Sequence, residues 1–184
     1  MPKSDGQIYE ACGQALAQET ARLLGKPGTV VILTPNTGPS PSPVHARYLS
    51  SFNTHLKKQP GLSVAATEKI TPSEEGCPAA AFVAVLKKHP TADAVVSFVG
   101  PPVLQGADFK TLPARRPKLV VLGGGPALTR TLMARKVLDV SFLPRRHSKS
   151  AEAAPPAQAR TPFEDLYQLV TPATVATWTA KGSP

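Results

Sequence analysis

Apolar residues recur along the chain in two patterns, one with the spacing of a helix and one with the continuous character of a buried strand. A short continuous aliphatic run is typical of a strand that is covered on both faces, as in a parallel sheet. Five such runs are present, at 29–33, 62–66, 94–98, 118–122 and 139–143. The run 29–33 consists entirely of β-branched and aliphatic residues, so we expect it to be the central strand.

Between these runs, apolar residues fall on one side of a helix. The predicted helices cover 6–25, 44–58, 71–88 and 126–136, and a weaker helical signal covers 101–112. We expect the third helix to begin at Thr71-Pro72-Ser73, because proline and the two glutamates that follow suit a first helical turn. A short helix or turn at 162–168 is predicted to precede the last apolar run, 169–172.

The order of these elements predicts an α/β fold with a single doubly wound parallel sheet and helices on both faces. Right-handed crossovers then give the flavodoxin-like strand order 2-1-3-4-5. The chain has 184 residues, and domains commonly hold roughly 100–200, so we expect 1–184 to form one lobe. Residues 148–160 are rich in Ala, Pro, Ser and Gln and are predicted to be a flexible loop or tether.

The charge of the chain bears on its possible partners. The formal net charge is +9 and the pI is about 9.8, which would favour polyanions. However, the basic residues gather in two short clusters, 115–118 and 145–149, rather than along one helical face. Aromatic residues make up only 5% of the chain, too few to supply stacking platforms as well as a core. We therefore expect a solvated basic surface and no nucleic-acid binding.

Two further classes of structure are excluded or left open by the sequence. No apolar run approaches the ~20 residues of a membrane span, and the N-terminus lacks the apolar segment of a secretory signal, so we expect no membrane span. Cys12 and Cys77 are the only cysteines and do not have metal-ligand spacing. Two buried free thiols and one disulfide are both compatible with their positions.

In a doubly wound sheet, ligands bind beyond the carboxyl ends of the strands. The loops expected there are 34–43, 98–106, 123–127 and 143–148. They contain no paired carboxylates, no Ser-His-Asp set and no neighbouring Cys and His, so we expect a binding protein rather than an enzyme, with no cofactor or metal.

Four residues of these loops and of the helix that follows the first of them are candidate ligand-binding residues: Asn36, Arg47, Gln105 and Gly124. Asn36 and Gln105 could hydrogen-bond sugar hydroxyls or serve as turn residues. Arg47 could reach a polar ligand from the first turn of its helix or point into solvent. Gly124 belongs to a glycine turn that either holds an anion on its backbone N–H groups or simply makes a tight strand-to-helix connection.

Several phrases of the sequence resemble one known family when they are taken in order. They are 25–32 at the first strand, 87–95 before the third, 117–123 at the fourth, and 161–172 at the end. In this order they resemble the C-terminal lobe of the type I periplasmic solute-binding proteins of the ribose or sugar type and of the related repressor ligand-binding domains. The resemblance implies an extracytoplasmic protein of an ABC transporter, with a sugar or another small polar ligand held between two lobes. Because the chain has room for one lobe, a second lobe or a homodimer partner is implied.

The chain differs from the family pattern at positions that usually contact the ligand. Gly100-Pro101, Gly124 and Pro144 stand where members of the family usually carry polar residues. These differences motivate a second hypothesis, an interaction or regulatory domain that kept the fold and lost ligand binding. A third hypothesis is an enzyme of the flavodoxin-like class that uses the glycine turn for phosphate.

Overall fold

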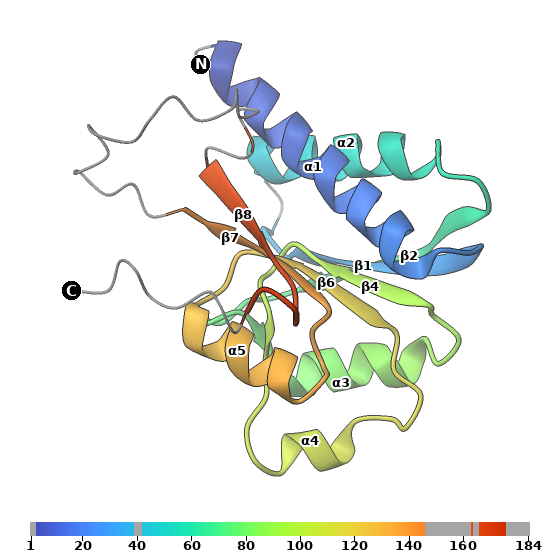
Figure 1. Ribbon diagram of the computed structural model, residues 1–184, viewed down its shortest axis with the longest axis vertical. Helices are drawn as coiled ribbons and strands as arrows, with labels where there is room; N and C mark the ends of the chain where they lie inside the picture. The colour runs from blue at the N-terminus through green and yellow to red at the C-terminus, as the bar shows by residue number, and fades with distance from the viewer. Residues whose placement is uncertain (1–2, 39–41, 146–162, 164–165, 176–184) are drawn as a thin grey trace.

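The computed structural model describes residues 3–38, 42–145, 163 and 166–175, and every structural statement below concerns these residues. The predicted tether at 148–160 lies outside them. The helices are α1 (Lys3–Leu24), α2 (Pro43–Leu56), α3 (Ala79–Lys88), α4 (Asp108–Thr111) and α5 (Pro126–Ala134). The strands are β1 (Gly28–Pro35), β2 (Leu62–Ile70), β3 (Cys77–Pro78), β4 (Ala94–Ser97), β5 (Pro102–Val103), β6 (Lys118–Leu122), β7 (Val140–Pro144) and β8 (Tyr167–Val170) (Figure 1).

The main sheet has the strand order β2-β1-β4-β6-β7-β8. The first five of these strands are the five predicted aliphatic runs, and every pairing among them is parallel. They therefore confirm the order 2-1-3-4-5. The prediction of a purely parallel sheet with a turn before residue 169 was wrong at the last edge, because β8 pairs antiparallel with β7. Tyr167 and Val170 belong to types that favour strands, and the pairing covers an edge that β7 would otherwise expose.

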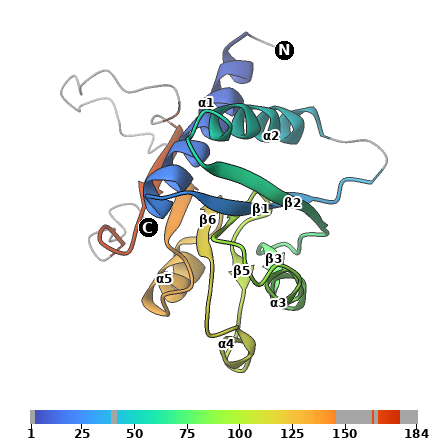
Figure 2. The same ribbon diagram turned by 90° about the vertical axis from the view of Figure 1, so that its right-hand side faces the viewer.

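Helices cover both faces of the sheet, as Figures 1 and 2 show. Alternate residues of the central strand point to opposite layers. Val30 and Ile32 belong to the core beneath α1 and α2, whereas Val31 and Leu33 belong to the core beneath α3 and α5. All four are fully buried. This explains why the middle of the strand, 30–33, has no polar residue in the sequence.

The helices α1 and α2 cross at very short range. A Cβ at Gly13 would lie 2.5 Å from the carbonyl oxygen of Tyr48 and 2.7 Å from the backbone nitrogen of Phe52. Ser51 also donates a hydrogen bond to the carbonyl oxygen of Glu10, at 2.6 Å. The absence of a side chain at Gly13 is thus what allows the two helices to pack against each other on this face.

The start of α3 differs from the prediction. The helix begins at Ala79 rather than near Thr71, and residues 71–76 form a loop. The physical reason lies in Pro78, which could not donate a hydrogen bond inside a helix and whose ring would clash with the preceding turn. Pro78 instead precedes the first helical residue, where its fixed φ causes no conflict. This change places residues 71–76 at the carboxyl edge of the sheet.

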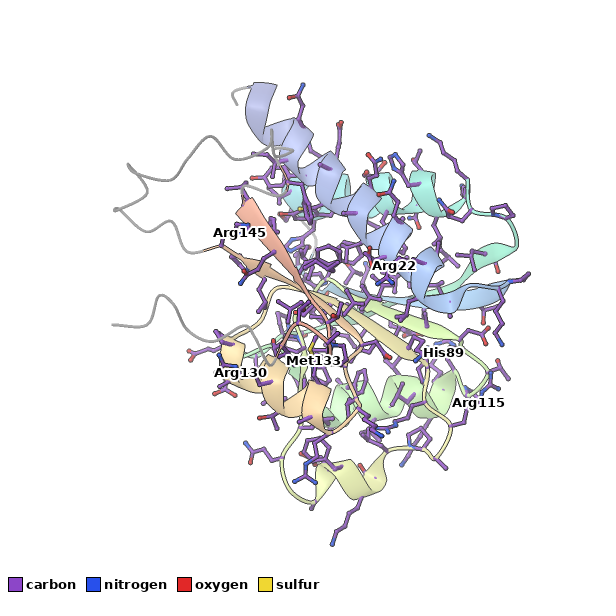
Figure 3. All side chains as sticks on the ribbon, in the orientation of Figure 1. Arg22, His89, Arg115, Arg130, Met133 and Arg145 are labelled. Atoms are coloured by element: carbon purple, nitrogen blue, oxygen red, sulfur yellow. The ribbon has the colours of Figure 1, made fainter. Side chains whose placement is uncertain are left out.

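Aspartates at the amino edge of the sheet connect neighbouring strands. The carboxylate of Asp93 accepts hydrogen bonds from the Thr29 backbone N–H, at 2.9 Å, and from the Thr29 hydroxyl, at 3.3 Å. It also lies 3.3 Å from Arg115. These contacts hold the pKa of Asp93 below its usual value, the Thr29 N–H contributing most. Figure 3 places Arg115 at this end of the molecule and Arg145 at the opposite, carboxyl end.

Candidate functional site

The carboxyl edge of the sheet contains a hollow of about 670 Å³ that is open to solvent. Three segments that are distant in the sequence line it: 73–76, 99–100, and Leu122 together with 124–128. The second segment follows β4 and the third connects β6 to α5. The first is the loop that replaces the predicted start of α3. The hollow is thus on the edge where ligands bind in doubly wound sheets.

Three glycines bring these segments together around one proline. Gly76, Gly100 and Gly124 all have positive φ, at 145°, 84° and 108°, which side chains other than glycine rarely adopt. A Cβ at Gly76 would overlap the carbonyl oxygen of Pro101, and a Cβ at Gly124 would lie 2.7 Å from the Pro101 ring. The two loops therefore approach the buried Pro101 from two sides because neither glycine carries a side chain.

Backbone hydrogen bonds fix the same arrangement. The Cys77 N–H donates to the Pro101 carbonyl oxygen at 2.9 Å, and β3 and β5 pair in parallel directly afterwards. Within the first loop, the N–H and hydroxyl of Ser73 both donate to the Gly76 carbonyl oxygen, at 2.9 and 3.0 Å. In the second, the buried Ser97 donates to the Gly100 carbonyl oxygen at 2.6 Å. These hydrogen bonds thus hold the loops at the rim of the hollow in place.

The helix α5 directs its amino end toward the hollow. Its N-cap is Gly125 and its first residue is Pro126, and no side chain in the described part of the chain caps it. The backbone N–H groups of the first turn of a helix have no carbonyl partner within the helix. Ala127 and Leu128, which line the hollow, belong to this turn. Backbone donors are therefore available at this wall for the oxygen atoms of a ligand.

The side chains around the hollow are chemically simple. Glu74 and Glu75 are exposed and lie on one rim, and Ser73 adds a hydroxyl. In the described part of the chain, no aromatic and no basic side chain is among the lining residues. The loop 73–76 therefore contributes oxygen acceptors to the hollow, and the first turn of α5 contributes backbone donors.

The four predicted ligand-binding residues are not brought together. Gly124 lines the hollow. Asn36 is exposed just after β1, where its N–H donates to the Ile70 carbonyl oxygen at 2.7 Å. The guanidinium of Arg47 lies against Gly6 of α1. Gln105 is exposed before α4, and its N–H donates to Asp108 at 2.8 Å. A role for Asn36, Arg47 or Gln105 in binding stays a prediction.

The contribution of the loop 71–76 does not follow from the sequence pattern. The pattern predicts a helix over these residues, which leaves Glu74 and Glu75 out of the polar groups expected at the carboxyl edge. Pro78 was the signal that could have revealed the loop, because a proline seven residues into a helix breaks it.

The cysteines lie in separate layers and are free. Cys12 lies on α1 and is buried in the core between α1, α2 and the sheet, and Cys77 is buried in the core beneath α3. Burial raises the pKa of Cys12 to about 12 and that of Cys77 to about 11, so both thiols are protonated and unreactive at neutral pH. The structure thus favours the first of the two alternatives for the cysteines.

A cluster of aromatic residues packs beside Cys12 on the same face. The hydroxyls of Tyr48 and Tyr167 lie 3.4 Å apart, and the ring of Tyr9 meets that of Tyr48 edge-on at 5.1 Å. Burial raises the pKa of both Tyr48 and Tyr167. These contacts join β8 to α1 and α2, which is a structural role.

Neither a metal centre nor a membrane helix is found among the described residues. No three His, Cys, Asp or Glu side chains are grouped closely enough there to hold a metal ion. None of the helices in the described ranges combines the length and the apolar character needed to cross a bilayer.

Comparison with known proteins supports the fold through structure rather than through sequence. No protein-family model matches the chain, and no curated protein matches it by sequence. Among solved structures, the fructose-binding periplasmic domain of a hybrid two-component system superposes with a TM-score of 0.65 at 16% identity, over 92% of this chain and 58% of that one.

Two further structures are similar. An arabinose-binding protein from Geobacillus stearothermophilus has a TM-score of 0.60 at 16% identity, over 94% of this chain and 63% of that one. A sugar-binding protein of a sugar ABC transporter from Bacillus halodurans has a TM-score of 0.60 at 12% identity, over 92% of this chain and 64% of that one.

The chain has the fold of a lobe of the type I periplasmic binding proteins, as the resemblance in the sequence implied. It spans 58% to 64% of the length of the three structures described.

Proposed function

We propose that the chain is a solute-binding lobe that holds a sugar or another small polar ligand in the hollow at the carboxyl edge, without changing it chemically. The observation that carries this proposal is the hollow itself, which lies between the loops after β4 and β6 on a fold shared with sugar-binding proteins. Its volume of about 670 Å³ is within the range of roughly 300–1,000 Å³ that is usual for ligand pockets.

The groups around the hollow suit a polyol better than an anion. Sugar hydroxyls both donate and accept hydrogen bonds. The carboxylates of Glu74 and Glu75 can accept from them, and the N–H groups of the first turn of α5 can donate to them. An anionic ligand would be repelled by the two carboxylates, since no basic side chain lines the hollow in the described part of the chain.

A partner is part of the same proposal. The hollow is open to solvent, and the chain covers only part of each similar structure. A second lobe or a second copy of the chain would supply the missing wall and exclude water from the ligand. Together with the fold, this favours an extracytoplasmic protein of a sugar transport system.

The alternative is an interaction or regulatory domain that kept the fold but does not bind a solute. The observation that favours it is the simplicity of the lining. In the described residues, no aromatic ring is available there to stack on a sugar, and Gly124 alone of the four predicted residues lines the hollow.

Thermal unfolding in the presence of sugars separates the two. A ligand present at about 100 times its Kd stabilises the native state by about 2.7 kcal/mol, which raises Tm by about 5–11 °C for a chain of this size. We expect such a rise with at least one of arabinose, fructose, glucose and galactose. No rise with any of them, together with a stable dimer in light scattering, would favour the interaction domain.

A matched pair of variants then tests the location of the site. Ala127 is exposed on the wall of the hollow, and Ala134 is exposed at the other end of the same helix. Ala127→Phe fills the hollow and should abolish the sugar-induced rise in Tm, whereas Ala134→Phe should leave it unchanged. If Ala127→Phe retains the full rise, the ligand binds elsewhere.

A further inference from the structure

A second hollow, of about 320 Å³, lies at the opposite end of α5 from the first. It is lined by Phe109 of α4, by residues 112–114 and Arg116 of the loop before β6, and by Arg135 at the carboxyl end of α5. None of these residues lines the hollow at the carboxyl edge. In Figure 2, α4 lies at the far side of the molecule from α1 and α2. This second hollow is therefore independent of the proposed sugar site.

Two guanidinium groups at this hollow are not neutralised. Arg116 and Arg135 are exposed, and neither forms a salt bridge with any residue that the structure describes. Their neighbour Arg115 does pair, with Asp93 at 3.3 Å, and the carboxylate of Asp108 accepts a hydrogen bond from the Gln105 N–H at 2.8 Å. These two carboxylates thus already have partners, and no acidic residue of the described ranges lines the hollow.

Arg135 is not required to cap its helix. The backbone itself satisfies the last carbonyl groups of α5. The Val137 N–H donates to Leu132 at 2.8 Å and the Lys136 N–H donates to Met133 at 2.9 Å, which is the pattern of a Schellman motif. The guanidinium is therefore free to bind a group from solution.

Two apolar side chains contribute to the lining of the hollow, whose exposed surface is otherwise mostly polar. Phe109 and Leu112 are partly buried and pack against the core beneath α3 and α5. The central carbon of the Arg135 guanidinium lies 5.1 Å from the centroid of the Phe109 ring. This cation–π contact orders a side chain that would otherwise move freely in solvent. The Arg135 guanidinium therefore covers one side of the Phe109 ring, and the two side chains together form one wall of the hollow.

We propose that this hollow binds a small organic anion in which a phosphate or carboxylate group is attached to a flat apolar group. The guanidiniums of Arg116 and Arg135 would donate charge-assisted hydrogen bonds to the oxygen atoms of the anion. The apolar part would lie against Leu112 and the part of the Phe109 ring that Arg135 does not cover. A volume of about 320 Å³ suits a ligand with one ring, since it lies at the lower end of the usual range of roughly 300–1,000 Å³.

Calorimetric titration with three probes tests the proposal at about 0.1 M salt, where distant surface charges are screened. The probes are phenyl phosphate, benzoate and inorganic phosphate. At least one of the two aromatic anions should bind saturably and about tenfold more tightly than inorganic phosphate, and the tighter of the two identifies the preferred acidic group. The proposal is overturned if neither aromatic anion binds, or if inorganic phosphate binds as tightly as both.

Three variants with the same change of charge locate the binding. Arg116→Gln and Arg135→Gln should each raise the Kd of the aromatic anion by about tenfold, because each removes a charge-assisted interaction. Lys57 lies at the exposed carboxyl end of α2, on the other face of the sheet. Lys57→Gln should therefore leave the Kd unchanged. Equal weakening by Lys57→Gln, or wild-type affinity in both arginine variants, would contradict the site. All three side chains are exposed, so unchanged circular dichroism spectra and Tm values are expected and confirm folding.

Discussion

Replacing Gly124 by alanine tests the packing that forms the rim of the hollow at the carboxyl edge. Gly124 has φ 108°, and a Cβ there would lie 2.7 Å from Cδ and 2.8 Å from Cγ of Pro101. Two other glycines separate the cost of the positive φ from the cost of the contact with Pro101. Gly123 has φ 88° with nothing within 4 Å of its Cβ position, and Gly106 has neither a positive φ nor a close neighbour.

The expected loss of stability follows from these geometries. Holding a residue other than glycine at such a φ costs about 1–3 kcal/mol. An ordinary carbon contact is about 3.5–4.0 Å long, so the alanine at Gly124 would also press into a rigid ring, at a cost of about 1–3 kcal/mol more. We therefore expect Gly106→Ala to be neutral, Gly123→Ala to destabilise by about 2 kcal/mol and Gly124→Ala by about 4 kcal/mol.

Urea unfolding followed by circular dichroism measures the three free energies of unfolding, and thermal unfolding provides an independent check. At about 2–4 °C per kcal/mol for a chain of this size, Tm should fall by about 4–8 °C for Gly123→Ala and about 8–16 °C for Gly124→Ala. Equal losses for Gly123→Ala and Gly124→Ala would show that Pro101 does not lie against Gly124. If Gly124→Ala does not change the free energy of unfolding, residue 124 neither has a positive φ nor contacts Pro101.

Three further residues give predictions of their own. Thr129 is fully buried and its hydroxyl has no hydrogen-bond partner among the described residues, so the isosteric Thr129→Val should raise the free energy of unfolding by about 1 kcal/mol; a loss in urea unfolding would show that the hydroxyl has a partner. Lys136 has φ 56° at the end of α5, so Lys136→Gly should raise Tm by a few degrees, and a lowered Tm would contradict the left-handed cap. The pKa of Asp93 is lowered in the folded state. Its contribution to stability is therefore present above the unfolded pKa of about 3.9 and is lost as the pH falls toward the lower folded value. Between about pH 5 and 2, the free energy of unfolding should fall more for the wild type than for Asp93→Asn. Urea unfolding at several pH values measures both, and the same pH dependence in the two proteins would contradict the Thr29 contacts.

The sheet could be predicted from sequence because its strands are buried on both faces. Runs such as 29–33 and 118–122 contain almost no polar position, and their order along the chain restricts the topology to a few choices. The edge strand β8 escaped prediction for the opposite reason. Only four residues long, with Leu169 exposed at its centre, it depends on pairing with β7 rather than on a pattern of its own.

The candidate site was less accessible to sequence reasoning. Gly124 was found because a glycine turn after a strand is visible in the sequence. The loop 73–76 could not be found in this way, because its position depends on contacts with Pro101, which lies about 25 residues further along the chain. These contacts are made by backbone atoms and glycines, and such contacts leave little trace in the pattern of apolar and polar residues.

The most direct test of the central claim is an NMR titration that follows the glycine amides of the isotopically labelled chain with the sugar that raises Tm most. Gly100, Gly124 and Gly125 line the hollow, whereas Gly13 and Gly28 lie at the crossing of α1 with α2 and at the amino end of β1. Saturable shifts at Gly100, Gly124 and Gly125, with Gly13 and Gly28 unchanged, are the predicted result. A sugar that binds without shifting the amide signals of Gly100, Gly124 and Gly125, or no sugar that binds at all, would contradict the claim that this edge of the sheet holds a solute.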